Sequence, residues 1–163
     1  MVQMFANHLD GTWSDQETQW AVGAATRAFE RHVKTPIASV CGGMEPYWRT
    51  YAGMWQAQAM TVSNTINGMG YVWIGGHSGL ETRLTGEVMQ ATLEIQDPKE
   101  ADILMNKIFA KRIEAMEAHK ASGVGPRHFT DAYDIETCTP KQALLDDYNR
   151  VKEELRAMGL KAL

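Results

Sequence analysis

The chain has 163 residues, of which 44% are hydrophobic and 22% are charged, and its formal net charge is -4 at pH 7. This length is enough for one domain with its own core, and the composition is that of ordinary globular proteins. The negative net charge gives no reason to expect nucleic acid or an anionic membrane as a partner.

The sequence has no feature typical of a membrane or secreted protein. No run approaches the roughly 20 apolar residues that span a bilayer, and residues 1–11 lack the basic start and apolar region of a secretory signal. Cys41 and Cys138 lie far apart and do not have the spacing of a metal-ligand pair. We therefore expect a reduced, cytoplasmic protein.

The chain begins with a short apolar run followed by a helical pattern. Residues 2–5 (VQMF) are a candidate strand, and residues 8–11 (HLDG) are the loop at its end. Residues 14–17 (SDQE) form a capping box, in which the serine hydroxyl accepts a helical N–H and the glutamate reaches back. The helix that follows should end before Pro36. At helical spacing it carries Trp20, Ala24, Ala28 (or Arg27) and Arg31.

Two further strands are predicted in the middle of the chain. Residues 36–41 (PIASVC) form one, and a long helix is expected over about residues 45–64. Residues 71–88 (YVWIGGHSGLETRLTGEV) read as a strand, a glycine-rich turn and a helix that opens at residue 78 or 79. Ligand chemistry in α/β folds is found where the carboxyl end of a strand meets a helix N-terminus. This stretch is therefore the predicted wall of an active site.

The second half of the chain is predicted to be helical. Residues 97–100 (DPKE) combine an N-cap, a proline and a capping carboxylate, so they start a helix that runs to about Ser122. Residues 139–140 start a last helix, and Gly159 is its C-cap. Each helix has one apolar stripe, which we interpret as a packing face. The stripes are Met105, Ile108, Phe109, Ile113 and Met116 in the first helix, and Leu144, Tyr148, Val151, Leu155 and Met158 in the second.

The order of the elements predicts an α/β fold. Strands that alternate with helices imply parallel strands joined by helical crossovers. About three strands are visible in the sequence, whereas a closed barrel of this type needs eight. The alternatives are a small open sheet or a part of a larger barrel.

Two histidines and two carboxylates are the candidate catalytic residues. His8 and Asp10 follow one predicted strand, and His77 and Glu81 follow another. If both loops lie on one rim, the four side chains converge and are suited to proton transfer or to metal binding. Their spacing is not that of an HExxH or CxxC motif, and structural hydrogen bonds are the alternative interpretation.

Several other residues have a functional and a structural interpretation. Cys41 ends a strand, where a thiol is a candidate nucleophile or an inert buried side chain. Arg83 is placed to bind an anion or to pair with Glu87 four residues on. Residues 75–79 have the position of a phosphate cradle but lack the P-loop ending. Aromatic side chains, among them Trp73, suit either a pocket for a small cation or the core.

Four segments resemble the monomethylamine methyltransferase family of methanogenic archaea. Residues 78–88 (SGLETRLTGEV) match a family segment that reads TGMEARMMGEV. HLDG at residues 8–11 is also a family sequence, YDIETCTP at residues 133–140 is close to YDVKTVTP, and MGL at residues 158–160 is close to LGL. The segments occur in the same order and cover nearly the whole chain, but only the C-terminal part of the family protein.

The resemblance implies a fold and a reaction. The family fold is a (β/α)8 barrel, of which residues 1–96 would hold the last β/α units and residues 97–163 a helical extension packed on them. The reaction moves a methyl group from monomethylamine, or a related methylated amine, to the Co(I) corrinoid of a partner protein. That corrinoid would be presented by the partner and not bound tightly by this chain.

The resemblance also implies site residues and shows two departures. The catalytic residues would be His8, Asp10, His77 and Glu81, and the substrate-binding residues Cys41, Trp73 and Arg83. The pyrrolysine of the family lies upstream of these segments. The family glutamine that faces it is missing from residues 37–41 (IASVC), where the cysteine alone is kept.

The sequence leaves three functions open. The chain is the C-terminal portion of a corrinoid-dependent methyltransferase, a truncated non-catalytic relative that binds a partner or oligomerises, or a small α/β enzyme that binds a phosphorylated ligand at Gly75–Gly79. A partial barrel exposes strand edges and apolar helix faces, so we also expect a homo-oligomer.

Overall fold

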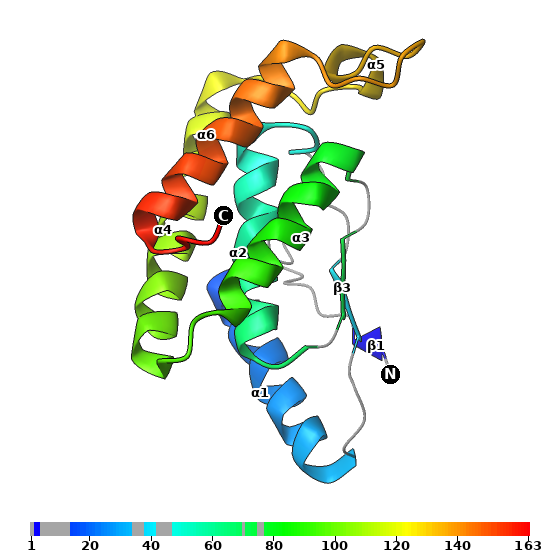
Figure 1. Cartoon of the computed structure of the whole chain (residues 1–163). Coiled ribbons are helices and arrows are strands. Elements are labelled where there is room, and N and C mark those ends of the chain that lie inside the picture. Colours follow the sequence, from blue (N-terminus) through cyan, green and yellow to red (C-terminus); the bar gives the residue numbers. More distant parts are fainter. Residues whose placement is uncertain (1, 4–13, 34–37, 42–46, 70, 75–76) are drawn as a thin grey trace.

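The structure is a computed structural model of the whole chain, and it describes residues 2–3, 14–33, 38–41, 47–69, 71–74 and 77–163. Strands and helices alternate in the first half, and helices follow in the second half (Figure 1). In chain order the elements are β1 (Val2–Gln3), α1 (Gln16–Val33), β2 (Ala38–Cys41), α2 (Tyr51–Ile66), β3 (Tyr71–Ile74), α3 (Gly79–Leu93), α4 (Pro98–Ser122), α5 (Phe129–Ala132) and α6 (Gln142–Met158).

The three strands form a small parallel sheet in the order β1-β2-β3. Val2 pairs with Ala38, and β2 pairs with β3 along its whole length, from Ala38–Tyr71 to Cys41–Ile74. The strands are two, four and four residues long. Because they are parallel, the carboxyl ends of β2 and β3 lie at the same edge of the sheet, and α3 follows directly after that edge.

The central element is α2, which is surrounded by other helices. Every residue from Ala52 to Thr65 is buried, as expected of a core helix rather than an amphipathic surface helix. It contacts α1, α3, α4, α6 and β3. Its threonines satisfy their hydroxyls within the helix, since Thr61 donates to the Ala57 carbonyl at 2.9 Å and Thr65 to the Thr61 carbonyl at 2.7 Å.

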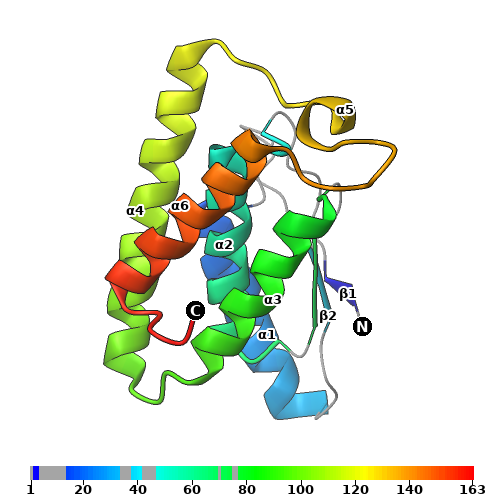
Figure 2. The same cartoon turned by 45° about the horizontal axis from the view of Figure 1, so that its top comes forward.

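The sheet lies along one side of the molecule, and α4 and α6 lie on the other side of α2 (Figures 1 and 2). One hydrophobic core is shared by α2, α3, α4 and α6, with Trp55, Leu84, Ile108 and Leu144 among its fully buried side chains. Helices on both sides of residue 96 therefore contribute to the same core, and a domain division there stays a prediction. None of the described helices is long and apolar enough to cross a membrane.

The prediction of an α/β fold made of the last units of a (β/α)8 barrel is wrong. Strands and helices do alternate, but the described chain is mainly helical and contributes three short strands to an open sheet. The physical reason is that the core formed by the described side chains gathers between α2, α3, α4 and α6. Periodicity in a sequence shows which face of an element is apolar, but not which element covers that face.

The order of the predicted strands and long helices agrees with the structure, but three helix starts differ. The last helix was expected to start at residues 139–140 and begins at Gln142. The short helix α5 was not predicted, and Ile113 of the predicted packing stripe is 46% exposed. The expected helix over residues 45–64 begins later, at Tyr51, because the Thr50 hydroxyl caps it by accepting the Gly53 N–H at 3.2 Å. In α1 the cap is Asp15, whose carboxylate accepts the Thr18 N–H at 2.8 Å. The expected capping serine, Ser14, instead accepts a hydrogen bond from the buried Arg112 side chain at 2.7 Å.

Glu87 joins α3 to α6. Its carboxylate accepts hydrogen bonds from the Tyr148 hydroxyl and the Lys152 ammonium, each at 2.7 Å, and pairs with Arg83 at 2.9 Å. Burial raises the pKa of Glu87, but the hydrogen bonds from Lys152, Tyr148 and Arg83 lower it more, to about 2. Burial and then the Glu87 carboxylate raise the pKa of Tyr148 to about 12.

Gly53→Ala should destabilise the chain because α2 approaches the preceding turn closely. A Cβ at Gly53 would lie 2.1 Å from the Tyr47 carbonyl oxygen. We expect the free energy of unfolding to fall by about 1–3 kcal/mol, measured by urea denaturation followed by circular dichroism. Gly86→Ala is the control, since nothing lies within 4 Å of a Cβ there, and it should stabilise α3 by about 0.5–1 kcal/mol. Equal effects of the two substitutions would contradict the close approach.

The pKa of Glu87 predicts that the contact between α3 and α6 is acid-sensitive. Folding lowers this pKa from 4.5 to about 2, so the unfolded chain binds more protons than the folded chain between these values. The stability that Glu87 contributes is then fully present above its unfolded pKa and is lost as the pH falls through its folded pKa. We expect the difference in unfolding free energy between the wild type and Glu87→Gln to shrink over that window in denaturation curves. A difference that is constant with pH would contradict the prediction.

Candidate functional site

The candidate site lies where the N-terminal ends of α2 and α3 meet, after the carboxyl end of β3. Residues 47–50 form the turn that enters α2, and Arg49 in this turn has a φ of 56°, which is uncommon for a residue other than glycine. The Thr50 hydroxyl holds the turn closed by donating to the Tyr47 carbonyl at 2.6 Å. This backbone conformation turns the Arg49 N–H toward α3, where it donates to Glu81.

Glu81 connects the two helix ends. Its side chain is buried, with 1% of the residue exposed. One carboxylate oxygen accepts the Arg49 N–H at 2.9 Å, and the other accepts the Ser78 N–H at 2.8 Å. A buried carboxylate is costly unless it is hydrogen-bonded, and a helix N-terminus favours negative charge. The two hydrogen bonds therefore offset the cost of burying the Glu81 carboxylate, and they also fix the start of α3 against the turn before α2.

Two arginines connect this turn to the segment that follows α4. Arg49 donates from Nε to the Arg127 carbonyl at 2.6 Å, and the Arg127 guanidinium donates back to the Arg49 carbonyl at 3.1 Å. The same guanidinium pairs with Asp147 of α6 at 2.7 Å. Burial raises the pKa of Asp147, while Arg127 acts to lower it. Four separate segments thus converge on one polar centre.

His77 is the titratable side chain of this centre with an open hydrogen-bonding position. Its Nδ1 is buried and has no hydrogen-bond partner among the described residues. Burial lowers the pKa of His77, and Arg49 lowers it further, while Glu81 acts in the opposite direction. These effects favour the neutral imidazole, which has one ring nitrogen that donates a hydrogen bond and one that accepts.

Tyr133 brings the segment between α4 and α6 to the start of α3. Its hydroxyl donates to Ser78 Oγ at 3.0 Å and accepts the Leu80 N–H at 3.0 Å, so it satisfies one of the free N–H groups in the first turn of α3. Its ring stacks on Phe129 with the ring centroids 4.7 Å apart. Figure 1 shows α5 beyond this end of α3.

The chemistry of the centre is acid–base and electrostatic. It combines a buried carboxylate, a neutral imidazole and two guanidinium groups. No group of three His, Cys, Asp or Glu side chains that would hold a metal ion occurs in the described part of the chain. These residues are suited to orienting a small polar or cationic ligand and to handling its protons.

The structure describes some of the predicted catalytic and substrate-binding residues. His77 lies close enough to Glu81 for that carboxylate to act on its pKa, although α3 begins at Gly79 and does not include His77. The catalytic roles of both residues stay predictions. His8 and Asp10 lie outside the described residues, so their convergence with His77 stays a prediction. Cys41 and Trp73 lie in the paired parts of β2 and β3, and their roles also stay predictions.

Arg83 forms the surface ion pair with Glu87 that was one of its two interpretations from the sequence. It pairs with Glu87 at 2.9 Å, and 69% of its side chain is exposed. The hydrogen bond from Arg83 is one of three to that carboxylate. Its predicted part in substrate binding is not tested by this geometry.

Sequence reasoning missed Arg49, Arg127 and Asp147. Arg49 and Arg127 are 78 residues apart, and no local pattern relates them. Tyr133 had one signal, because it opens the segment at residues 133–140 that matches the family. Contacts of this kind depend on how helices pack, which periodicity does not encode.

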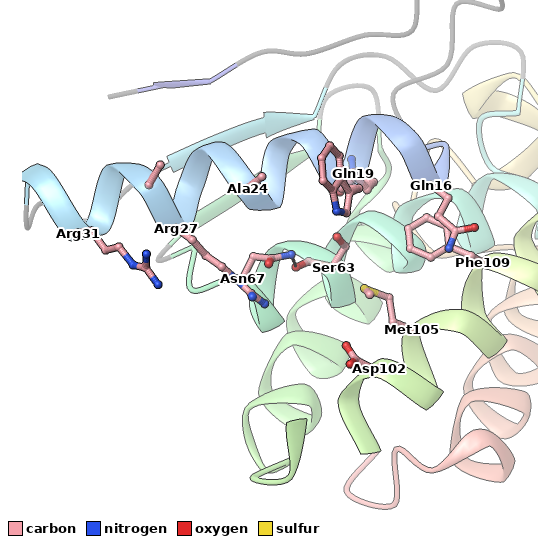
Figure 3. A pocket seen from close by; sticks show the side chains of 12 residues that line it. Gln16, Gln19, Ala24, Arg27, Arg31, Ser63, Asn67, Asp102, Met105 and Phe109 are labelled. Atoms are coloured by element: carbon pink, nitrogen blue, oxygen red, sulfur yellow. Dashed lines mark hydrogen bonds between the residues drawn. The ribbon is translucent and has the colours of Figure 1, made fainter. Parts of the chain in front are cut away.

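A pocket of about 490 Å³ lies away from this centre, between α1, the C-terminal part of α2 and α4 (Figure 3). It is an open groove rather than an enclosed cavity. Arg27, Arg31, Asn67, Asp102 and Phe109 are among its lining residues. None of the residues of the candidate site lines it.

Comparison with known proteins finds one family. The family model of monomethylamine methyltransferase MtmB matches residues 63–160. Monomethylamine methyltransferase MtmB2 of Methanosarcina acetivorans is 30% identical over 83 residues, which are 51% of this chain and 17% of that protein. MtmB1 of Methanosarcina barkeri is 29% identical over 83 residues, with the same coverage. The chain therefore matches less than a fifth of the length of these relatives.

Solved structures show a similar fold. The crystal structure of the Methanosarcina barkeri monomethylamine methyltransferase superposes with a TM-score of 0.81 at 18% identity, and the match covers 97% of this chain and 35% of that one. The hydroxylamine complex of MtmB superposes with a TM-score of 0.78 over the same fractions. The arrangement of helices and strands described here thus corresponds to about a third of that larger chain.

Glu81→Gln should loosen the junction between α2 and α3. The amide group would turn a donor toward one of two main-chain N–H donors, so one buried N–H would lose its acceptor. We expect the free energy of unfolding to fall by about 1–3 kcal/mol, measured by denaturant titration. Glu94→Gln, at the exposed C-terminal end of α3, is the matched control and should have little effect. An unchanged stability of Glu81→Gln would mean that the carboxylate does not hold the two helices.

Proposed function

The chain belongs to the monomethylamine methyltransferase MtmB family, and from that premise we propose that it forms the C-terminal portion of an enzyme that moves a methyl group from monomethylamine, or a related methylated amine, to a corrinoid protein. The methyl donor and the corrinoid partner are part of the proposal, and so is a cytoplasmic location.

The observation that carries the proposal is the buried Nδ1 atom of His77, which has no hydrogen-bond partner among the described residues. Burial lowers the pKa of the His77 imidazole. A methylammonium ion carries three N–H donors on a small cation, which an uncharged nitrogen acceptor near the Glu81 carboxylate suits.

The reaction needs the amine nitrogen to leave and the methyl group to be held in line with the acceptor. The C–N bond breaks, its electron pair stays on nitrogen, and a protonated amine leaves as ammonia. The corrinoid of the partner protein would supply the Co(I) nucleophile that accepts the methyl group. In this chain His77 would accept a hydrogen bond from one N–H of the methylammonium ion. The ion would keep its three protons until the C–N bond breaks.

Glu81 has a positioning role in this proposal. Both of its oxygens accept hydrogen bonds from main-chain N–H groups, so Glu81 does not contact the substrate. Its negative charge and its position at the start of α3 act on His77, and His77 contacts the substrate. We propose that His8 and Asp10 complete the catalytic rim and that Cys41, Trp73 and Arg83 contact the substrate.

A non-catalytic role is the second candidate. Both Glu81 oxygens and the main-chain N–H and Nε of Arg49 are used in structural hydrogen bonds, and the chain matches 17% of the length of its relatives. A relative that kept this packing and lost the chemistry would act as a binding or oligomerisation domain. The phosphate-binding alternative depends on Gly75 and Gly76, which lie outside the described residues.

The test is the release of ammonia from monomethylamine in the presence of a reduced corrinoid protein. We expect the wild-type protein to release ammonia, and His77→Ala to lower the rate by about 10²-fold because the ammonium loses its acceptor. His128→Ala, which changes an exposed histidine at the start of α5, is the matched control and should keep the wild-type rate.

Two outcomes would contradict the methyltransferase. In the first, the wild-type protein releases no ammonia from any methylamine but still forms a complex with the corrinoid protein in sedimentation velocity. That result would establish the binding role. The other is an active protein in which His77→Ala and His128→Ala have equal rates, which would remove His77 from the site.

A further inference from the structure

Arg127, in the segment between α4 and α5, joins the turn before α2 to α6. Its main-chain N–H donates to the Trp48 carbonyl at 3.1 Å. Its guanidinium donates to the Arg49 carbonyl at 3.1 Å and to the Asp147 carboxylate at 2.7 Å. Arg49 donates in return, from Nε to the Arg127 carbonyl at 2.6 Å. Two segments that are 78 residues apart in the chain are therefore fixed to each other by main-chain and side-chain hydrogen bonds.

Asp147 makes this contact between two arginines favourable. Arg49 and Arg127 carry the same charge, so bringing them together costs free energy unless a negative charge lies nearby. The Asp147 carboxylate pairs with Arg127, and 18% of its side chain and 30% of the Arg127 side chain are exposed. Charge-assisted hydrogen bonds of partly buried groups are stronger than those of exposed pairs. The ion pair therefore keeps the Arg127 guanidinium beside the Arg49 carbonyl.

The turn passes this constraint on to the candidate site. Arg49 has a φ of 56°, a conformation that a residue with a side chain keeps only when its surroundings hold it. In this conformation its main-chain N–H donates to Glu81 at 2.9 Å. Glu81 on α3 and Arg49 in the turn are also the charged groups of the described chain that act on the His77 imidazole. The position of both groups beside His77 thus depends on what holds the turn.

We propose that Arg127 is a positioning residue of the candidate site, which acts through its hydrogen bond to the Arg49 carbonyl and its ion pair with Asp147 to keep Arg49 and Glu81 in place beside His77. The catalytic consequence rests on the proposed function, whereas the positioning is a property of the chain that can be measured without any substrate.

The test is the pKa of the His77 imidazole, measured by NMR titration of the whole chain with nitrogen-15-labelled histidine. The His77 signals are identified by their loss in His77→Ala. In Arg127→Gln the turn should relax, so that the Arg49 guanidinium moves away from His77 and Glu81 becomes free to pair with the imidazolium. Both changes favour the protonated imidazole. We expect the His77 pKa to rise toward its ordinary value of 6.5.

Asp147→Ala separates positioning from the direct effect of charge. Loss of a negative charge by itself disfavours the imidazolium and would lower the His77 pKa. If Arg127 positions the turn, the loss of its ion-pair partner frees its guanidinium, and the His77 pKa should rise as it does in Arg127→Gln. Asp147→Asn is the milder variant, because its amide oxygen still accepts a hydrogen bond, and it should give a smaller rise.

Arg150→Gln is the matched control for the loss of a positive charge. Arg150 lies on α6 near Asp147, and 61% of its side chain is exposed in its pair with Glu154. This substitution should leave the His77 pKa unchanged. Circular dichroism should show native helix content in each variant before its titration.

The ammonia-release assay gives the catalytic consequence. A protonated His77 cannot accept a hydrogen bond from the methylammonium ion, so the acidic limb of the pH–rate profile should move to higher pH in Arg127→Gln, by the same shift as the pKa measured by NMR. If the wild type releases no ammonia, the methyltransferase proposal fails, and the two pKa shifts still decide the role of Arg127.

Two results would overturn the positioning role. His77 pKa shifts of opposite sign in Arg127→Gln and Asp147→Ala would mean that the two groups act on His77 by charge alone. A His77 pKa that both variants leave unchanged would mean that the contacts of Arg127 do not reach the site.

Discussion

The carboxylate of Glu81 holds the starts of α2 and α3 together, because each of its oxygens accepts one main-chain N–H from a different helix entrance. Such a buried carboxylate has an energetic cost that only complete hydrogen bonding offsets. The turn before α2 must therefore keep Arg49 in its left-handed conformation, and α3 must begin directly after β3. The position of His77 beside this junction follows from the same constraint.

The rest of the fold is arranged around the helix that this junction anchors. Because α2 is buried on all sides, α3, α4 and α6 pack on it and on one another in a single core. Polar contacts then connect the outer helices, with Glu87 between α3 and α6 and Arg127 between the turn and Asp147 of α6. The small sheet sets the edge from which α3 starts, because α3 follows the carboxyl end of β3.

Two surfaces of different character result from this arrangement. At the junction, charged groups are buried and mutually satisfied, and the Nδ1 of His77 is the one side-chain acceptor of this centre that we propose for a ligand. Along α1, the indole of Trp20 is 76% exposed, and the helix has an acidic residue in its first turn and basic residues in its last turn.

The sequence by itself determined the order of the strands and long helices and the ends of several of them, since capping residues, prolines and glycines act locally. It also identified the family, through residues 78–88 and 133–140. Tertiary structure decided that the core lies between helices, that Ser14 binds Arg112, and that Arg49 meets Arg127. These contacts join residues far apart in the chain, and they form only when whole helices pack, so no local pattern contains them.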